Sequence, residues 1–310
     1  MKTNPTSVQR VASIDIGTNT ILLLIADVGQ GKINPLFEME TVVRLGEGVH
    51  RNGILSKGAM ERGLQTLSQY SERCRAMKVQ KIFVVGTSAL REAKNSEVFL
   101  KLVKQKLDFS VDIISGEEEA HLSFLAVARD LRKTGEPLMV VDIGGGSTEF
   151  ILGKDDQIRR WISLPLGSVR FTEQCLHSDP VQEEEWQELK RKILESLIDV
   201  PRSQEPVSMV AVGGTATTLA SVEQGLEEFV AEKIHHFALR KESLKNQLLL
   251  YRSKTIEERK KIPGLPAARA DVILAGAAIL YLTMEELSCS SVLISSHGVR
   301  YGLIYKMLTL

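Results

Sequence analysis

Short apolar runs that lead into glycine-containing turns set the pattern of this chain. Residues 138–141 are apolar and lead to Asp142, and residues 150–152 are apolar again after the intervening glycines. A similar pattern surrounds Asp15, where residues 21–28 follow the turn and are apolar except for one aspartate. Apolar runs of this length between turn residues are typical of buried β-strands. Both stretches therefore predict a strand, an Asp-Ile-Gly turn and a second strand.

The recurrence of this hairpin pattern predicts an internal duplication. Two occurrences with the same flanking residues imply two similar half-structures that face each other. A chain of 310 residues is long enough for about two domains, each with its own core. We place the first domain at residues 1–132 together with a closing helix at 298–310, and the second domain at residues 133–297. The boundary follows a helix expected from Gly116 to about Arg132.

Strands and helices alternate through the rest of the sequence, which predicts an α/β fold. Apolar residues at helical spacing predict an amphipathic helix over 56–77, and a charged helix is expected over 183–196. A β-branched run, small residues and then a helical pattern occur at 81–93 and again at 209–218. Residues 164–170 are expected to form a loop. Further short strands are expected at 111–115, 158–163 and 291–294.

The glycine turns carry the candidate chemistry. Consecutive glycines let the backbone approach a ligand closely, so that several N–H groups can converge on one anion such as phosphate. The acidic residues at the ends of the 142–149 turn can hold Mg²⁺ through water and orient a nucleophile. For the glycine triplet alone, an ordinary hairpin turn with acidic flanks remains the alternative. Residues 213–215, Gly-Gly-Thr before a helix, form a second candidate phosphate site.

The sequence argues against two common nucleotide-binding motifs. No stretch matches the P-loop pattern G-x-x-x-x-G-K-[ST], and the glycine triplet is followed by strand-like residues 150–152 instead of the helix of a dinucleotide-binding turn. Two facing strand-turn-strand motifs with aspartates describe a duplicated fold that clamps phosphates between its halves. Actin, Hsp70 and the sugar kinases share this plan.

The amino-acid composition restricts the binding partners and the cellular compartment that we expect. Lys plus Arg and Asp plus Glu are 39 each, so no overall field favours nucleic acid or an anionic membrane. Three cysteines without metal-like spacing suit a reducing compartment, and we interpret them as ordinary buried thiols. Residues 1–10 are polar, and no apolar run reaches the ~18 residues that a membrane span requires. A cytoplasmic location is expected.

Several motifs occur in an order that matches a known family. They are DIGTNT (15–20), VRLG (43–46), GTSALR (86–91), SGEEEA (115–120), DIGGGSTE (142–149), GGT (213–215), PGL to RAD (263–271) and GVR (298–300). With them the sequence resembles the exopolyphosphatase and guanosine pentaphosphate phosphatase (Ppx/GppA) family along nearly its whole length, in a short two-domain form. The resemblance implies an actin-like ATPase (ribonuclease H-like) fold with a central cleft. It also implies Mg²⁺-dependent hydrolysis of terminal phosphoanhydride bonds of inorganic polyphosphate.

The resemblance also assigns roles to residues. Glu118 would be the general base that activates water, in a catalytic set with Asp142 and Glu149. Asp15, Asp142 and Glu149 would hold Mg²⁺ or position the water, and spacing does not decide which of the last two meets the metal. The phosphate-binding set would be Thr18, Asn19, Arg91, Gly144, Gly145, Gly146, Ser147, Gly213, Gly214, Thr215 and Arg269. From the residues alone, the glutamates 117–119 could equally stay solvated at a helix start.

One departure bears on the substrate. Family members that bind alarmones carry a basic residue after the first Asp-Ile-Gly turn, and Leu22 stands at the matching position here. Leucine cannot bind a phosphate or a guanine edge, so we favour polyphosphate over guanosine tetra- or pentaphosphate. Homodimerisation is expected by family analogy alone.

Alternatives remain open at this point. A kinase or ATPase of the same fold would bind ATP through residues 213–215, and a non-catalytic sensor would bind without turnover. His235 matches a family histidine, but neither it nor His236 has a spaced partner, so neither is expected to bind metal. Arg170 and Arg300 belong either to a basic polyphosphate track or to ordinary ion pairs.

Overall fold

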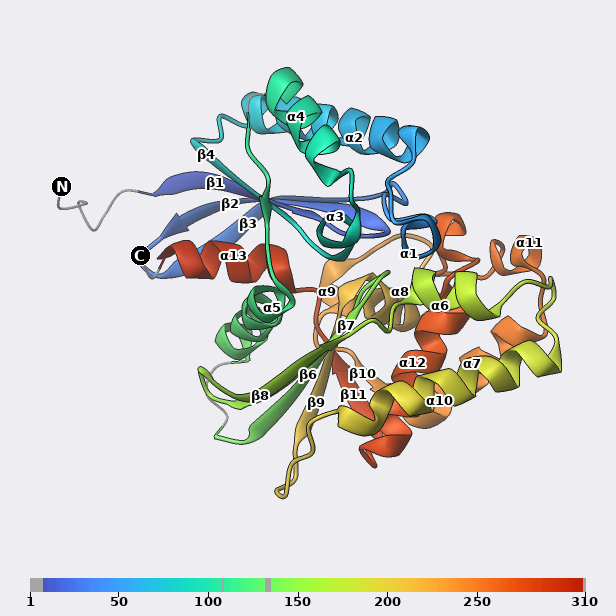
Figure 1. Ribbon diagram of the computed structural model, residues 1–310. Helices are drawn as coiled ribbons and strands as arrows, with labels where there is room; N and C mark the ends of the chain where they lie inside the picture. Colours follow the sequence, from blue (N-terminus) through green and yellow to red (C-terminus); the bar gives the residue numbers. More distant parts are fainter. Residues whose placement is uncertain (1–7, 108, 132–134, 309–310) are drawn as a thin grey trace. The chain divides into compact units, whose positions relative to one another are not determined.

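The chain folds into two compact units. The computed structural model describes residues 8–107, 109–131 and 135–308. Unit 1 comprises Met1–Ala126 and Val299–Leu310, and unit 2 comprises Val127–Gly298. The chain passes from unit 1 to unit 2 within helix α5 (Gly116–Asp130) (Figure 1). The boundary expected between residues 132 and 133, and the expected helix end at Arg132, lie outside the described residues.

Unit 1 is built on a five-stranded mixed sheet in the order β3-β2-β1-β4-β5. The pairs β1–β2 and β2–β3 are antiparallel, whereas β1–β4 and β4–β5 are parallel. The strands are β1 Gln9–Ile16, β2 Thr20–Gly29, β3 Lys32–Val42, β4 Lys81–Gly86 and β5 Asp112–Ile113. The last of these is shorter than the strand expected over 111–115.

Helices cover both faces of the unit 1 sheet. Successive residues of a strand point to opposite faces, and Leu23 and Leu24 accordingly belong to different buried clusters. The Leu23 cluster includes Leu67 and Phe99 from α2 and α4, whereas the Leu24 cluster includes Tyr301 from α13. The helices of this unit, besides the first turns of α5, are α1 Val49–Asn52, α2 Lys57–Ala76, α3 Ser88–Glu92, α4 Ser96–Leu107 and α13 Val299–Leu308.

Unit 2 repeats the sheet of unit 1. Its order, read as β8-β7-β6-β9-β11-β10, has the same succession of antiparallel and parallel pairs, with β10 added antiparallel at the edge. The strands are β6 Pro137–Ile143, β7 Thr148–Lys154, β8 Gln157–Leu164, β9 Ser208–Val212, β10 Ala238–Arg240 and β11 Ser291–Ile294. The duplicated α/β fold predicted from the two hairpins is therefore confirmed.

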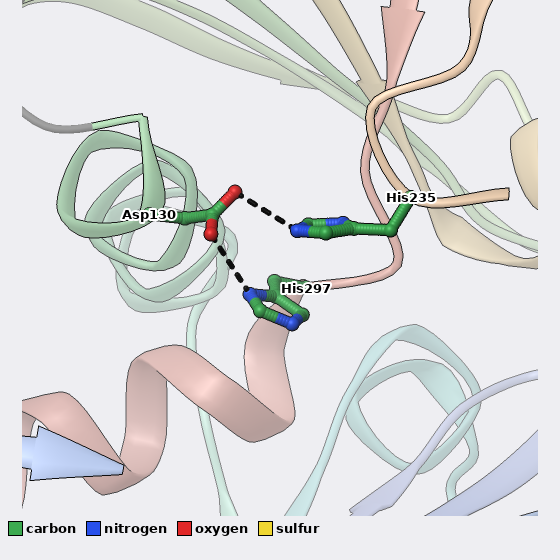
Figure 2. Close-up of side chains that lie close together, drawn as sticks. All are labelled: Asp130, His235 and His297. Atoms are coloured by element: carbon green, nitrogen blue, oxygen red, sulfur yellow. Dashed lines mark ion pairs between the residues drawn. The ribbon is translucent and has the colours of Figure 1, made fainter. Parts of the chain in front are cut away.

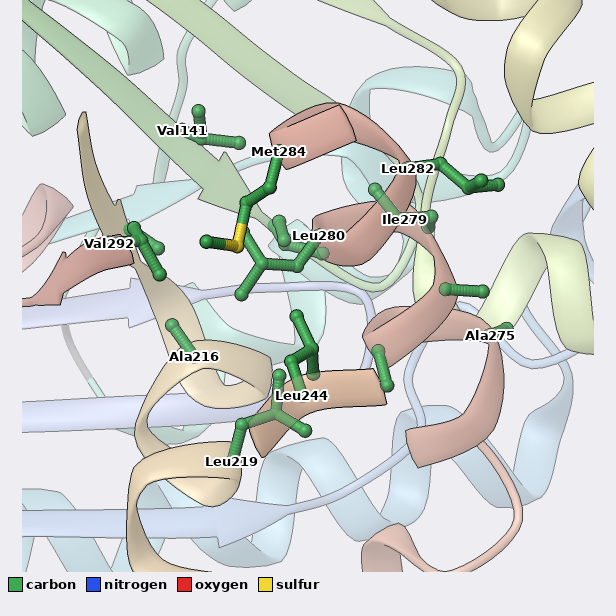
Figure 3. Close-up of a cluster of buried hydrophobic side chains, with 14 of the residues drawn as sticks. Val141, Ala216, Leu219, Leu244, Ala275, Ile279, Leu280, Leu282, Met284 and Val292 are labelled. Carbon is green, nitrogen blue, oxygen red and sulfur yellow. The ribbon is translucent and has the colours of Figure 1, made fainter. Parts of the chain in front are cut away.

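The core of unit 2 lies between its sheet and a layer of helices around α12. Helix α12 (Ile273–Glu286) is buried on nearly every side, and Ile279 and Leu280 pack in one cluster with Val141 of the sheet and Leu219 of α8 (Figure 3). The other helices of the unit are α6 Ser168–Cys175, α7 Glu183–Ser196, η1 Leu197–Asp199, α8 Gly213–Glu223, α9 Ala231–Ile234, α10 Lys241–Arg252, α11 Ile256–Arg259 and η2 Ala267–Arg269.

Two local expectations were wrong. Residues 164–170 were expected to be a loop, but α6 begins at Ser168, where Ser168, Phe171 and Cys175 form a buried helical face. Cys289 is only partly buried, whereas the other two cysteines are buried thiols as expected. Among the described helices, none combines the length and the apolar character needed to cross a membrane.

Candidate functional site

The two Asp-Ile-Gly turns have the same backbone geometry. The N–H of Gly17 donates to the carbonyl of Thr20 at 3.0 Å, and the N–H of Gly144 donates to the carbonyl of Ser147 at 3.0 Å. Each turn ends a strand that pairs in parallel with the next strand of its sheet, β4 in unit 1 and β9 in unit 2. Each unit therefore places an aspartate, a turn and the start of a following helix at one edge of its sheet.

In unit 2, two carboxylates stand opposite each other on this hairpin. Asp142 and Glu149 are direct cross-strand partners, which brings their Cβ atoms to within about 5 Å. Glu149 is 1% exposed and its Oε1 accepts a hydrogen bond from Ser163 Oγ at 2.7 Å. Asp142 Oδ1 lies 2.9 Å from the position that a Cβ on Gly213 would occupy. Glycine at that position, where φ is +90°, thus lets the Asp142 carboxylate reach the start of α8.

Hydrogen bonds to its carbonyl groups hold the glycine triplet of unit 2 in place. The N–H of Ser168 donates to Gly144 at 3.0 Å, and Arg170 Nε donates to the carbonyl of Gly146 at 2.8 Å. Gly167 packs so closely that a Cβ there would lie 2.3 Å from the Gly145 carbonyl oxygen. Within the described residues, the N–H groups of Gly145 and Gly146 have no backbone partner. Those N–H groups can bind an anion.

A second candidate anion-binding element is the start of α8. Gly213, Gly214 and Thr215 form its first turn, whose N–H groups have no partner within the helix itself. The guanidinium of Arg269 lies directly on this turn, because a Cβ on Gly214 would be 2.0 Å from Arg269 Nη2. Arg269 is 5% exposed and comes from η2. The structure therefore brings these four predicted phosphate-binding residues together, next to Asp142.

In unit 1, the loop of residues 43–46 holds the turn that follows Asp15. The N–H of Gly46 donates to the carbonyl of Thr18 at 2.8 Å, and Val43 donates to that of Asn19 at 2.9 Å. The side chains of Thr18 and Asn19 are 8% and 5% exposed. Among the described residues, none forms a hydrogen bond with Thr18 Oγ1 or with either polar atom of the Asn19 side chain. Such buried groups cost about 1–3 kcal/mol each, which a bound ligand would recover.

The glutamates at the start of α5 differ in their partners. Arg91 Nη1 lies 3.1 Å from Glu119 Oε2 and also donates to the carbonyl of Ile114 at 2.8 Å. Glu118 Oε1 lies 2.6 Å from Lys306 Nζ of α13, and both of these side chains are exposed. Arg91, assigned to phosphate, is therefore oriented by Glu119 and not by Glu118. The sequence did not indicate either partner, and Lys306 in particular comes from the far end of the chain.

Two arginines that were ambiguous in the sequence have structural partners. The side chain of Arg300 is 8% exposed and forms an ion pair with Glu38, which also accepts a hydrogen bond from Tyr301 Oη at 2.7 Å. Arg300 thus belongs to an ion pair inside unit 1. Arg170 donates a hydrogen bond to the glycine triplet, as described above, and so helps to hold the shape of this turn.

His235 has two potential ligand neighbours that the sequence did not indicate. Asp130, His235 and His297 present ligand atoms that all lie within 4.8 Å of one another (Figure 2). All three belong to unit 2. The sequence does not indicate this group, because its members come from three distant segments and have no short spacing.

Comparison with known proteins gives a consistent result. A sequence model described as the Ppx/GppA phosphatase family matches residues 24–310. The curated protein Exopolyphosphatase 2 of Mycobacterium tuberculosis (strain CDC 1551 / Oshkosh) is 33% identical over 311 residues, which cover 95% of this chain and 97% of that protein.

Solved structures that resemble this chain point to the same family. The Aquifex aeolicus member of the Ppx/GppA protein family is 34% identical, with a TM-score of 0.83 and 98% of each chain covered. An exopolyphosphatase from Cytophaga hutchinsonii ATCC 33406 is 27% identical, with a TM-score of 0.89 over 97% of this chain and 98% of that one. The duplicated fold and the ordered motifs thus agree with these comparisons, and the chain belongs to the Ppx/GppA phosphatase family.

Proposed function

We propose that the protein is an exopolyphosphatase that removes terminal phosphoryl groups from inorganic polyphosphate with the help of Mg²⁺. Family membership makes it a hydrolase of phosphoanhydride bonds. The observation that carries the proposal is the grouping in unit 2, where the facing carboxylates Asp142 and Glu149 adjoin two sets of anion-binding N–H groups and Arg269. Acidic groups beside phosphate-binding groups suit a substrate that arrives with a divalent cation.

The residues present fit such a cation. Asp142 and Glu149 offer hard carboxylate oxygens from one hairpin, and Ser163 donates a hydrogen bond to Glu149 Oε1. Asp15 stands at the matching position of the turn in unit 1, and its part in metal binding stays a prediction. We assign the metal in unit 2 to Asp142 and Glu149. When bound, Mg²⁺ would neutralise charge on the phosphate oxygens and help position water.

The protein groups supply the rest of the reaction. The N–H groups of Gly145, Gly146 and the first turn of α8 would bind the phosphoryl oxygens, with Arg269 adding positive charge. Thr18 and Asn19 offer unfilled hydrogen-bonding capacity in unit 1. Glu118 would accept a proton from water as the water attacks the terminal phosphorus, while the bond to the bridging oxygen breaks. Orthophosphate leaves, and the chain is one unit shorter.

The preference for polyphosphate over guanosine pentaphosphate rests on Leu22. This residue is the direct cross-strand partner of Asp15. In unit 2 the residue at the equivalent position is Glu149, the cross-strand partner of Asp142. The apolar side chain of Leu22 can bind neither a phosphate nor a guanine edge, so it offers no group for recognising the nucleotide. The homodimer and the cytoplasmic location also remain parts of the proposal, and sedimentation of the purified protein would measure its oligomeric state.

Three substrates test the proposal. Phosphate release is measured from long-chain polyphosphate, guanosine pentaphosphate and ATP, each with Mg²⁺ and with a chelator. We expect the highest kcat/KM for polyphosphate and loss of activity with chelator. Faster release from guanosine pentaphosphate would overturn the substrate assignment. ADP formation that depends on an added sugar or acid would instead indicate a kinase.

A further inference from the structure

We propose that Asp130, His235 and His297 form a binding site for a transition-metal ion such as Zn²⁺, separate from the proposed Mg²⁺ ligands. Figure 2 shows the three side chains directed toward one another from the end of α5, the segment after α9 and the segment after β11. The site lies wholly within unit 2.

The distances suit tetrahedral coordination. Asp130 Oδ2 lies 3.2 Å from His235 Nε2, and Asp130 Oδ1 lies 3.6 Å from His297 Nδ1. Ligand atoms at 2.0–2.1 Å from a tetrahedral Zn²⁺ are about 3.3–3.4 Å from one another, and each of these two distances is close to that length. The two distances involve different oxygens of Asp130, so only one of them is an edge of a site in which the carboxylate gives a single ligand atom; the three ligand atoms of such a site all lie within 4.8 Å of one another. Three protein ligands would leave the fourth position to water. The rings of His235 and His297 stack on each other, with their centroids 4.2 Å apart.

His236 has a different part in this cluster. Its Nε2 lies 2.7 Å from Asp130 Oδ2, which is a hydrogen-bond distance and shorter than the ligand spacing around Zn²⁺. We therefore assign His236 to orienting the carboxylate and not to the metal. Outer partners of this kind support metal ligands.

The contacts of Ser296 with His235 should limit the affinity of the site for a metal ion. His235 Nδ1 now accepts a hydrogen bond from the N–H of Ser296 at 3.2 Å. Coordination through Nε2 places the proton on Nδ1, where the Ser296 hydroxyl, 3.4 Å away, is the available acceptor. Loading the site therefore exchanges one partner of Nδ1 for another, and we expect weaker binding than in a preorganised structural zinc site.

The ligand set distinguishes this site from the proposed Mg²⁺ ligands. Imidazole nitrogen suits Zn²⁺, Co²⁺ and Ni²⁺, whereas Mg²⁺ prefers oxygen ligands. Asp130 lies shortly after the passage of the chain into unit 2, and His297 lies just before its return at residue 299. A bound ion would therefore join the two segments that connect the units, and we expect it to raise the melting temperature.

Cobalt binding tests the proposal independently of activity. The full chain, stripped with chelator and dialysed, is titrated with Co²⁺ while visible d–d absorption is recorded. We expect the intense bands of tetrahedral Co²⁺, which Zn²⁺ removes and excess Mg²⁺ leaves unchanged. Asp130→Asn and His297→Gln should each weaken Co²⁺ binding by ~10-fold or more. His177→Gln, an exposed histidine of the same unit, is the matched control and should bind like the wild type.

Two results would overturn the site. One is a folded wild-type protein that develops no such bands in excess Co²⁺. The other is unchanged binding in both ligand variants. Circular dichroism of the metal-free variants checks their folding. If neither folds, X-ray absorption of the cobalt-loaded wild type decides, because imidazole scattering in a four-coordinate shell supports the site and a six-oxygen shell contradicts it.

Discussion

Asp142 and Glu149 face each other as cross-strand partners at the mouth of the glycine turn in unit 2. Two carboxylates this close repel each other unless positive charge or hydrogen-bond donors lie nearby. Ser163 supplies one donor to Glu149, and the start of α8 adjoins Asp142. A divalent cation would complete this balance, so the pair is the natural target for mutation.

Removing either charge should weaken Mg²⁺ binding. We expect Asp142→Asn and Glu149→Gln to raise the Mg²⁺ concentration for half-maximal phosphate release by ~10-fold or more, because each removes a hard anionic ligand. Ser163→Ala should shift it in the same direction but less, since Glu149 loses only an orienting hydrogen bond. The exposed Ser208→Ala is the control. Equal Mg²⁺ dependence in all four proteins would remove the pair from the metal site.

The two adjacent glutamates of α5 should behave differently. Glu118→Gln should lower kcat for polyphosphate by ~10²-fold or more with little change in polyphosphate binding, as expected for loss of a general base. Glu119→Gln should mainly raise KM, because Arg91 loses the carboxylate that orients it. Steady-state kinetics and equilibrium binding separate the two effects. A large fall in kcat for Glu119→Gln with normal turnover in Glu118→Gln would exchange the two roles.

A substitution at a neighbouring residue can displace the Arg269 side chain. In Gly214→Ala, the new Cβ would lie 2.0 Å from Arg269 Nη2, so the guanidinium must move. We expect KM for polyphosphate to rise by ~10–100-fold, the usual cost of a lost charged hydrogen bond. The fold should survive, because the obstructed group is the end of a flexible side chain. Gly58→Ala in α2, where the nearest atom is 3.6 Å away, is the control and should leave KM unchanged.

The cysteines give a pH-dependent prediction. Burial raises the pKa of Cys74 from 9.0 to about 11. Because the folded pKa is the higher one, the buried thiol stabilises the fold below pH 9, and this contribution is lost as pH rises from about 9 to 11. By linkage it amounts to about 3 kcal/mol at most. Cys74→Ala should therefore lose less unfolding free energy than the wild type over this range, as urea titrations would measure. An identical loss in both proteins would contradict this contribution.

Thiol labelling provides a second check on burial. At pH 8 the partly buried Cys289 should react with a maleimide before Cys74 and Cys175, which should react only after unfolding. Mass spectrometry of the labelled peptides identifies the order. Rapid labelling of Cys74 in the folded protein would show that its surroundings open readily.

Much of the fold follows from local sequence. The hairpins at Asp15 and Asp142 were predictable because apolar runs, a small-residue turn and a second run are all contiguous. The recurrence of that pattern then indicated the duplicated sheet order. The start of α6 was missed because Leu164, Pro165 and Gly167 suggest a loop, and the helical face becomes evident only with the buried residues that follow.

The partners of the site residues were not predictable in the same way. Lys306 reaches Glu118 from α13, and Ser163 reaches Glu149 from the neighbouring strand. The cluster of Asp130 with His235 depends on the packing of α5 near distant loops. Such contacts arise from tertiary packing, for which a single sequence carries no spacing signal. Motif resemblance therefore proposed groups that would bind phosphate but gave no information about the side chains that contact them.

The position of water attack tests the central claim most directly. A single turnover of tripolyphosphate is carried out in H₂¹⁸O with Mg²⁺, and the products are analysed by mass spectrometry. Attack on the terminal phosphorus predicts that ¹⁸O appears in orthophosphate and not in pyrophosphate, and that Glu118→Gln slows its appearance by ~10²-fold or more. Label in pyrophosphate, or unlabelled products with transfer of the phosphoryl group to an acceptor, would contradict the account.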